Sequence, residues 1–436
     1  MQKAIPDITT ASKSPRPFAA SEAKLLWLSS LGSSLEFYDF VVFVFFTAVI
    51  GKLFFAPGIP DWVRQTQTFG LFAAGYLARP LGGIVMAHFG DTVGRKRMFT
   101  LSVLLMATPT LLIGLLPTYQ TIGIAAPLLL LLLRILQGIA IGGEVPGASV
   151  FVAEHARRDK VGFAIGLLTG GLSFGIFLGS LMATSINLTF TQAEIAAGIW
   201  RVPFLVGGLF GLIAMWLRRW LKETPVFEEM QRRATLSQEM PLSVVFQKHR
   251  RSVIVSMIST WMLTAAVVVV MLMTPTLMPK LFGLAPGALR IPNLVATAVL
   301  CIANVAVGVA TDKFGVRRVA IPSLLFLVLS TYGLYFGAAH MPSMLLTFYV
   351  FAAIGAASSV LSPLVMVFAF PAKVRFSGVS VSYNLAYAIF GGLTPLLVSW
   401  LAHLDRFGPA HYVAAVAILC LCALFIWPLA DERQSS

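Results

Sequence analysis

The chain has 436 residues, of which 58% are hydrophobic and only 11% are charged, with a formal net charge of +14. Soluble domains carry about 25% charged residues, so this composition excludes a soluble protein and requires an outer surface that faces lipid. The basic residues lie in short clusters between apolar runs, without interleaved stacking aromatics, and this excludes a nucleic-acid-binding surface.

Apolar runs divide the chain into membrane spans, each about as long as a helix that crosses a bilayer. Residues 1–24 are polar, and no A-x-A-like cleavage site follows them, so we expect a cytoplasmic tail and not a signal peptide. The first six spans are predicted at 25–51, 66–89, 98–116, 124–153, 162–186 and 202–220. The second six are predicted at 252–274, 291–311, 318–339, 343–370, 376–402 and 411–430.

The predicted fold class is therefore an all-α membrane protein with twelve transmembrane helices in two pseudo-symmetric six-helix halves. These halves are expected at 25–220 and 252–430, joined by a polar, basic cytoplasmic linker at 221–251 and followed by a short tail at 431–436. With both termini inside, 24 of the 32 Lys and Arg residues lie on the cytoplasmic side. The positive-inside rule thus predicts cytoplasmic N and C termini.

A loop motif occurs twice, once in each half. The loop after the second span reads Gly90-Asp91-Thr92-Val93-Gly94-Arg95-Lys96, and the loop after the eighth contains Asp312, Gly315 and Arg317. The two aspartates are 221 residues apart, about half the chain. This repeat predicts parallel halves related by an axis along the membrane normal, with a binding site between them.

With this repeated G-x-x-x-D-x-x-G-R-[KR] pattern, the chain resembles the major facilitator superfamily. Further motifs are similar to those of its metabolite:proton symporter family, whose members move citrate, 2-oxoglutarate, shikimate, and proline or betaine. These motifs are Leu35–Phe40, Arg79–Gly83, Arg134–Gly138, Gly142–Glu144, Trp200–Phe204, Glu223–Pro225, Tyr383–Asn384 and Phe390–Pro395. The stretch 267–273 departs from the family pattern, because it lacks the aromatic residues that often line the seventh span.

Five charged residues are predicted inside spans, all in the first half: Glu36, Asp39, Arg79, Arg134 and Glu144. Charges in spans are costly, so such residues are candidates for function. A carboxylate beside an arginine is sensitive to burial and to a bound anion, as proton coupling requires. A permanent structural ion pair between the first two spans is the alternative interpretation.

We accordingly predict proton coupling by Asp39, Glu36 and Glu144. The predicted substrate-binding residues are Arg79, Arg134, Gln137, Tyr383 and Asn384. The resemblance also implies a conformational latch at the cytoplasmic rim, formed by Asp91, Gly94, Arg95, Asp312, Gly315 and Arg317, in which an aspartate interacts with a helix N-terminus.

The predicted function is proton-coupled symport of a small carboxylate across the bacterial inner membrane, by a protein that works as a monomer among lipids. Symport of a zwitterionic osmolyte such as proline or betaine is the alternative. An enzyme is not expected, because the six histidines are scattered and no HExxH-like spacing occurs. A sensor is disfavoured by the short tails. No cofactor, metal site or nucleic-acid partner is predicted.

Overall fold

A computed structural model describes residues 20–92, 95–218, 228, 232, 241–285 and 287–426. These residues fold into helices and short connections, without a strand among them. The helices of the first part are α1 (Ala20–Phe45), α2 (Thr47–Phe54), α3 (Asp61–Thr92), α4 (Arg95–Leu115), α5 (Tyr119–Ile122), α6 (Ala125–His155), α7 (Val161–Thr189), α8 (Gln192–Ala197) and α9 (Val202–Arg218). Those of the second part are α11 (Pro241–Lys248), α12 (Arg250–Thr264), α13 (Thr274–Phe282), α14 (Arg290–Phe314), α15 (Val316–His340), α16 (Leu345–Ala356), α17 (Leu361–Ala369), α18 (Arg375–Ala386), α19 (Gly392–Leu404) and α20 (Gly408–Ile426).

The expected all-helical membrane fold is confirmed. Ten segments of the described chain are long and apolar enough to cross a membrane. The two other predicted spans correspond to α3, which is 32 residues long, and to α4, whose apolar part is the shorter stretch Thr100–Leu115. Their lower hydropathy reflects the glycines, threonines and arginines that these helices carry.

Three of the long segments contain irregular turns. A π-helical stretch, Ala265–Met273, joins α12 to α13 in one continuous segment from Arg250 to Phe282. A second π-helical stretch, Tyr387–Gly391, joins α18 to α19. A 3₁₀ turn joins α16 to α17. Turns of the π type occur often at functional sites, so these two stretches indicate where to look for one.

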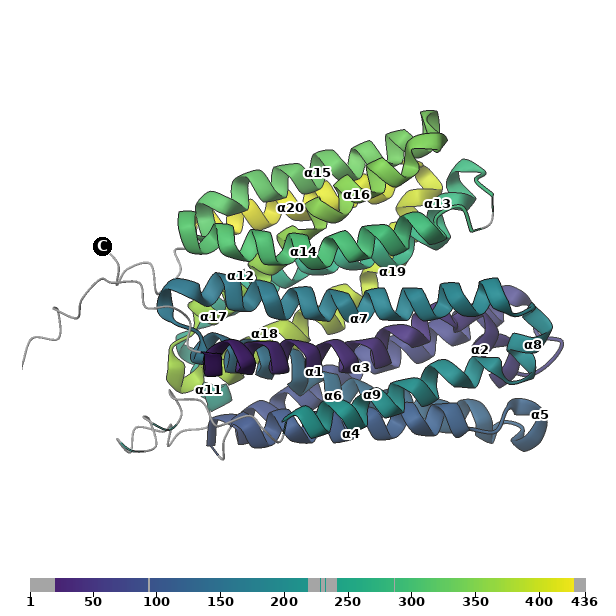
Figure 1. The fold of residues 1–436 in the computed structure, drawn as a ribbon, viewed down its shortest axis with the longest axis horizontal. Helices are drawn as coiled ribbons and strands as arrows, with labels where there is room; N and C mark the ends of the chain where they lie inside the picture. Colours follow the sequence, from purple (N-terminus) through teal and green to yellow (C-terminus); the bar gives the residue numbers. More distant parts are fainter. Residues whose placement is uncertain are drawn as a thin grey trace, which may run out of the picture.

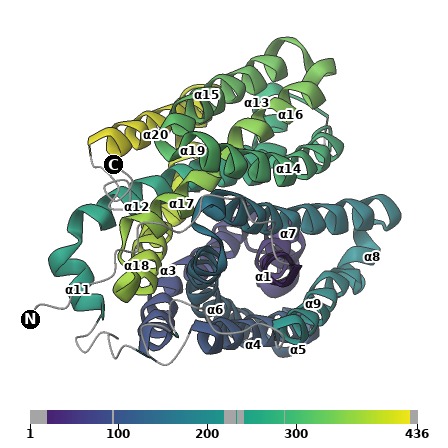
Figure 2. The same cartoon turned by 60° about the vertical axis from the view of Figure 1, so that its left-hand side comes forward.

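The helices form two layers. Figure 1 shows α1 to α9 in one layer, coloured purple to teal, and α13, α14, α15, α16 and α20 in the other, while α17 and α18 overlap the first layer in this view. We call α1 to α9 the N-terminal half and α12 to α20 the C-terminal half. In Figure 2, α1 lies inside a ring of helices that includes α4, α6, α7 and α9. All four of these helices contact it, so the residues of α1 are buried on most sides.

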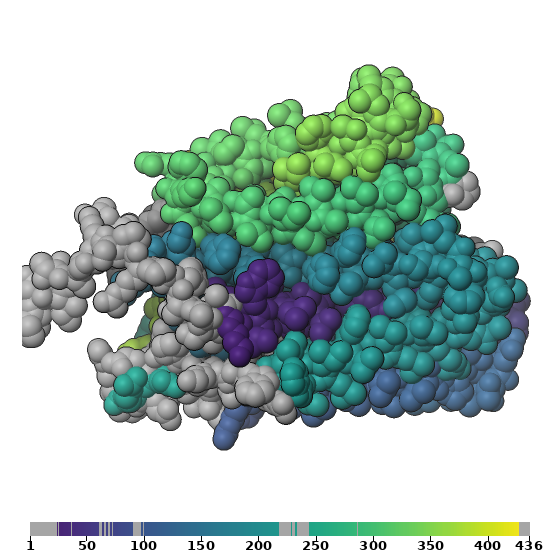
Figure 3. Space-filling model, viewed as in Figure 1, coloured from purple at the N-terminus to yellow at the C-terminus, as the bar shows by residue number. Residues whose placement is uncertain are grey.

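The most extensive contacts between the halves are those of α7 with α14 and of α3 with α18. Figure 3 shows the two halves meeting along α7 and α14 over the visible face. Glycines allow this close approach, because a side chain at Gly162 or Gly166 would collide with the α14 backbone near Gly308. Hydrogen bonds from Ser180 to Asn293 and from Asn304 to Ser173 extend the contact along the pair.

The long helices alternate in direction along the chain, so α3, α6 and α14 end, and α7 and α18 begin, at the end of the bundle where α11 lies. Figure 1 shows α11 and the beginning of α1 at this end, on the left. We call it the α11 end. The predicted cytoplasmic location of this end stays a prediction.

Candidate functional site

A small cavity lies between the two halves, near the middle of four long segments. Its volume is about 20 Å³, roughly the space that one water molecule needs. The lining residues are Phe37, Phe40, Val41, Val44, Tyr76, Arg79, Val267, Val268, Leu272 and Tyr387. They come from α1, α3 and both π-helical stretches, so each half forms part of the wall.

Arg79 is the one charged residue among those that line this cavity. Its side chain is only 1% exposed. Nε and Nη2 of its guanidinium have no hydrogen-bond partner among the described residues. A buried donor without a partner is costly, and two adjacent guanidinium N–H groups fit a carboxylate in a bidentate arrangement. Arg79 therefore presents donors that a carboxylate could accept, and its role in substrate binding stays a prediction.

Four aromatic rings surround the Arg79 guanidinium. Its Cζ lies 4.2 Å from the ring centroid of Tyr387, 5.2 Å from Tyr383, 5.4 Å from Tyr76 and 5.9 Å from Phe40. The rings of Tyr76 and Tyr387 are nearly parallel, with centroids 5.8 Å apart. Cation–π attraction holds a guanidinium in such surroundings without a counter-ion.

The position of Arg79 follows from close packing of α3. Gly83, one turn after Arg79, faces α18 so tightly that a Cβ there would collide with the Asn384 amide. The Ser380 hydroxyl donates to the Gly83 carbonyl at 2.9 Å. Glycine at this position lets α18 approach α3, and the approach brings Tyr383 and Tyr387 to Arg79.

Asn384 lies outside the cavity lining and joins the halves instead. Its Nδ2 donates to the Gly142 carbonyl of α6 at 2.6 Å and to the Ser380 carbonyl of its own helix at 2.8 Å. We call the contacts of Ser380 and Asn384 with Gly83 and Gly142 the α18 seam. Of the two predicted substrate-binding residues in α18, Tyr383 packs on Arg79 and Asn384 belongs to this seam.

Arg134 and Gln137 form a hydrogen-bonded chain inside the N-terminal half. Arg134 Nη1 donates to Gln137 Oε1 at 2.8 Å, Gln137 Nε2 donates to Thr110 Oγ1 at 2.8 Å, and Thr110 donates to the Met106 carbonyl. The Arg134 guanidinium also lies over the rings of Phe43 and Phe40, at 4.2 and 5.0 Å. Neither Arg134 nor Gln137 lines the cavity, and the Phe40 ring lies near both the Arg134 and the Arg79 guanidinium groups.

Asp39 is fully buried in α1 and points away from the cavity, toward α9. A Cβ at Gly207 would collide with its Oδ1 and approach the Thr110 methyl group, so glycine at 207 leaves room for the carboxyl group. Neither carboxyl oxygen makes a hydrogen bond of good geometry with a described residue, although the Thr110 side chain is close enough to interact with the group. The structure thus places Asp39 beside the Arg134–Gln137–Thr110 chain and not beside Arg79.

Of the two other predicted proton-coupling residues, the structure describes the side chain of Glu144 but not that of Glu36. Glu144 is fully buried in α6 and interacts electrostatically with Asp39. The side chain of Glu36 lies outside the described residues, although its backbone belongs to α1. Asp39 and Glu144 are thus both buried within the N-terminal half.

The predicted latch is described in its second copy. Asp312, near the end of α14, accepts hydrogen bonds from the backbone N–H groups of Gly162 and Phe163 at 2.6 and 2.7 Å. It thus neutralises the N-terminus of α7 from the other half. Gly315 has a φ of +84°, which suits glycine between α14 and α15, and Arg317 is half-buried. In the first copy, the side chains of Asp91 and Arg95 and the whole of Gly94 lie outside the described residues.

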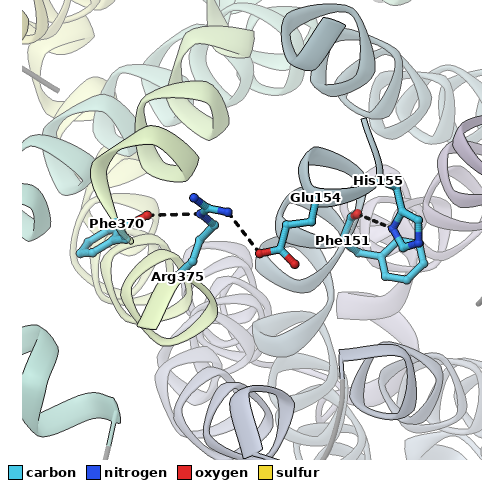
Figure 4. A network of polar contacts seen from close by, with 5 residues as sticks. All are labelled: Phe151, Glu154, His155, Phe370 and Arg375. Carbon is cyan, nitrogen blue, oxygen red and sulfur yellow. Dashed lines mark hydrogen bonds and ion pairs between the residues drawn. The ribbon is translucent and has the colours of Figure 1, made fainter. Parts of the chain in front are cut away.

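One ion pair across the halves at the α11 end is not predicted from the sequence. Arg375 Nη1, at the start of α18, lies 3.2 Å from Glu154 Oε1, near the end of α6. Arg375 Nε also donates to the Phe370 carbonyl, and His155 Nδ1 lies 2.9 Å from the Phe151 carbonyl (Figure 4). The sequence does place opposite charges at neighbouring ends of the fourth and eleventh predicted spans, and this pattern could have suggested the ion pair.

The aromatic residues around Arg79 are likewise largely unpredicted. Tyr76 precedes Arg79 by three residues and so shares its helix face; that spacing could have identified it. Phe40 follows Asp39 directly and carries no polar signal. In the described part of the chain, no group of three or more His, Cys, Asp or Glu residues could hold a metal ion.

Residues 41–299 match the family model of the Major Facilitator Superfamily. A citrate-proton symporter of Klebsiella pneumoniae is 32% identical over 402 residues, which cover 90% of this chain and 88% of the relative. A proline/betaine transporter of Salmonella typhimurium is 31% identical over 424 residues, covering 91% and 82%. The proton:xylose symporter XylE has the same fold, with a TM-score of 0.77 at 16% identity over 93% of this chain and 95% of that one.

Proposed function

This chain belongs to the major facilitator superfamily as a multi-pass membrane transporter and not an enzyme, and from that premise we propose that it is a proton-coupled symporter of a small solute recognised through a carboxylate. Alternating access between the two halves would carry the solute across the inner membrane, with 25–220 and 252–430 moving as units. The observation that supports this most is Arg79, a buried cation with two unpartnered N–H donors at a cavity between the halves.

Proton coupling is proposed for Asp39, in contact with the Arg134–Gln137–Thr110 chain. Burying a carboxylate far from water is costly, and a bound proton removes much of that cost. The carboxyl group faces Gly207 and not the cavity, so proton and solute would bind at separate places. Phe40 lines the cavity and lies against Arg134, and we propose that movement of these two side chains links the two sites.

A zwitterionic osmolyte such as proline or betaine is the second candidate substrate. Arg79 is the one charged residue among those lining the described cavity, and aromatic rings form much of the remaining wall. One cation suits one carboxylate, and aromatic faces attract quaternary ammonium groups. A tricarboxylate would need further cations, for which Arg134 is the nearest described candidate.

A ligand panel tests the carboxylate requirement. The purified protein in detergent is expected to gain thermal stability from proline, betaine or citrate, because a ligand that binds only the folded state raises its melting temperature. The matched analogues without a carboxylate, pyrrolidine and choline, are expected to give no shift. Equal shifts from betaine and choline would contradict recognition through Arg79, and measurements at two pH values report the proton dependence.

The Glu154–Arg375 pair and Asp312 are proposed to keep the α11 end closed. Glu154→Gln or Arg375→Gln removes this partly buried ion pair between the halves, so we expect that end to open more often, by roughly tenfold. In a variant whose three native cysteines are replaced by serine, Ser380→Cys should then react faster with a water-soluble maleimide added from the α11 end. The exchanged double variant E154R/R375E should restore slow labelling. Fast labelling in the double variant would show that the charges do not hold this end together.

A further inference from the structure

The Arg79 site is assembled from both halves. The N-terminal half supplies Arg79 itself, Tyr76 and Phe40, and the C-terminal half supplies Tyr383 and Tyr387. The shortest of the four cation–π distances, 4.2 Å, is the one to Tyr387. The ring that contributes most to holding the guanidinium thus comes from the opposite half.

An aromatic ring that contacts the face of a guanidinium leaves the N–H groups along the guanidinium edge able to bind a ligand. Nε and Nη2, which have no hydrogen-bond partner among the described residues, lie on that edge. A carboxylate binds in the guanidinium plane, whereas aromatic rings attract the cation through their faces. The two interactions are compatible, and the rings limit the orientations that Arg79 can adopt before a solute arrives.

Tyr387 reaches Arg79 through contacts made elsewhere on the same segment. Tyr387 begins the π-helical stretch that continues α18, and α18 is fixed to the N-terminal half by the α18 seam. The Tyr387 ring also lies 4.7 Å, centroid to centroid, from the Tyr383 ring and packs against Tyr76. If the α18 seam opens, Tyr383 and Tyr387 move away from Arg79 together with α18.

We propose that Tyr387 is a positioning residue that orients Arg79 for the solute carboxylate by a cation–π contact across the halves. The inference rests on the proposed role of Arg79 as the carboxylate-binding group. It follows that the carboxylate site is complete only while α18 is docked on α3. Solute affinity is therefore highest when the α11 end is closed.

A fluorination series at position 387 tests this directly. Tyr387→Phe keeps the ring and removes the hydroxyl group, so the Kd of this variant is the reference with which every fluorinated ring is compared. Replacing that Phe with its mono-, di- and trifluoro derivatives withdraws electrons from the ring with little change in size. Solute affinity should then fall stepwise, by about tenfold across the series. The probe is whichever of betaine, proline or citrate stabilises the unmodified protein.

A purely structural role for the ring predicts the same Kd throughout the series, and that result would overturn the proposal. Asn384→Ala gives a second measurement that does not touch the cavity, and it should weaken binding of the same probe by loosening the α18 seam. Unchanged affinity in that variant would contradict the dependence on docking. Arg79→Gln is measured in parallel. Normal binding there would refute the proposed function itself, whereas lost binding there with a flat fluorine series would refute only this inference.

Discussion

Asp39→Asn is expected to abolish accumulation of the solute against its gradient while leaving exchange of solute across the membrane intact. Asparagine has nearly the shape of aspartate, so the space opposite Gly207 should still accept it. The amide cannot take up and release a proton at physiological pH, so the proton gradient can no longer drive transport. One pH unit corresponds to about 1.4 kcal/mol per proton, roughly tenfold accumulation, and this factor should fall to about one.

The measurement uses purified protein in liposomes with an imposed pH gradient, followed by exchange in the same vesicles. Asp405→Asn is a matched control, since Asp405 lies in the loop between α19 and α20. Its pKa is lowered chiefly by a hydrogen bond from the Phe407 N–H, and His411 adds a second contact. That variant should accumulate solute normally. Normal pH-driven accumulation by Asp39→Asn would remove Asp39 from the coupling mechanism.

Arg79→Gln should weaken solute binding by at least about 100-fold, because a buried charge pair that loses one partner leaves the other without compensation. Glutamine keeps hydrogen-bonding capacity and much of the length, so the loss reports the charge and its planar shape. The Kd is measured by calorimetry or by the thermal-shift titration described above. Arg134→Gln is the comparison, since Arg134 is equally buried but does not line the cavity.

For Arg134→Gln we expect a smaller loss of binding and a larger effect on proton-driven accumulation, because Arg134 belongs to the chain beside Asp39. If both arginine variants lose binding equally, the solute reaches deeper into the N-terminal half than the cavity lining indicates. If Arg79→Gln binds normally, the carboxylate site is elsewhere.

Much of the fold can be predicted from the sequence because hydropathy and span length are local properties. The predicted spans match the observed helices to within a few residues at most ends, for example 291–311 against α14. The largest difference is at the seventh span, predicted to end at 274, where the helical segment continues to Phe282. Thr274-Pro275 suggested an end to the span, but proline is tolerated in the first turn of α13.

The arrangement of the site is less predictable, because the position of a residue along its helix does not specify which neighbouring helix its side chain faces. Asp39 and Arg79 are both predicted inside spans, and both are buried. Consecutive residues of a helix point about 100° apart, so Asp39 faces α9 while its neighbour Phe40 faces Arg79. Only the packing of α1 within its ring of helices decides which residue turns toward the cavity. The same holds for Tyr383 and Asn384 of α18.

The π-helical stretch at 265–273 has a consequence for aligning this chain with its relatives. A π turn closes hydrogen bonds one residue further along than an α turn, so it contains an additional residue at nearly the same length. A homologue whose seventh helix is α-helical throughout would therefore show a one-residue deletion in this stretch. Placing that gap outside 265–273 would shift the register and assign the wrong side chains to the positions of Val267, Val268 and Leu272.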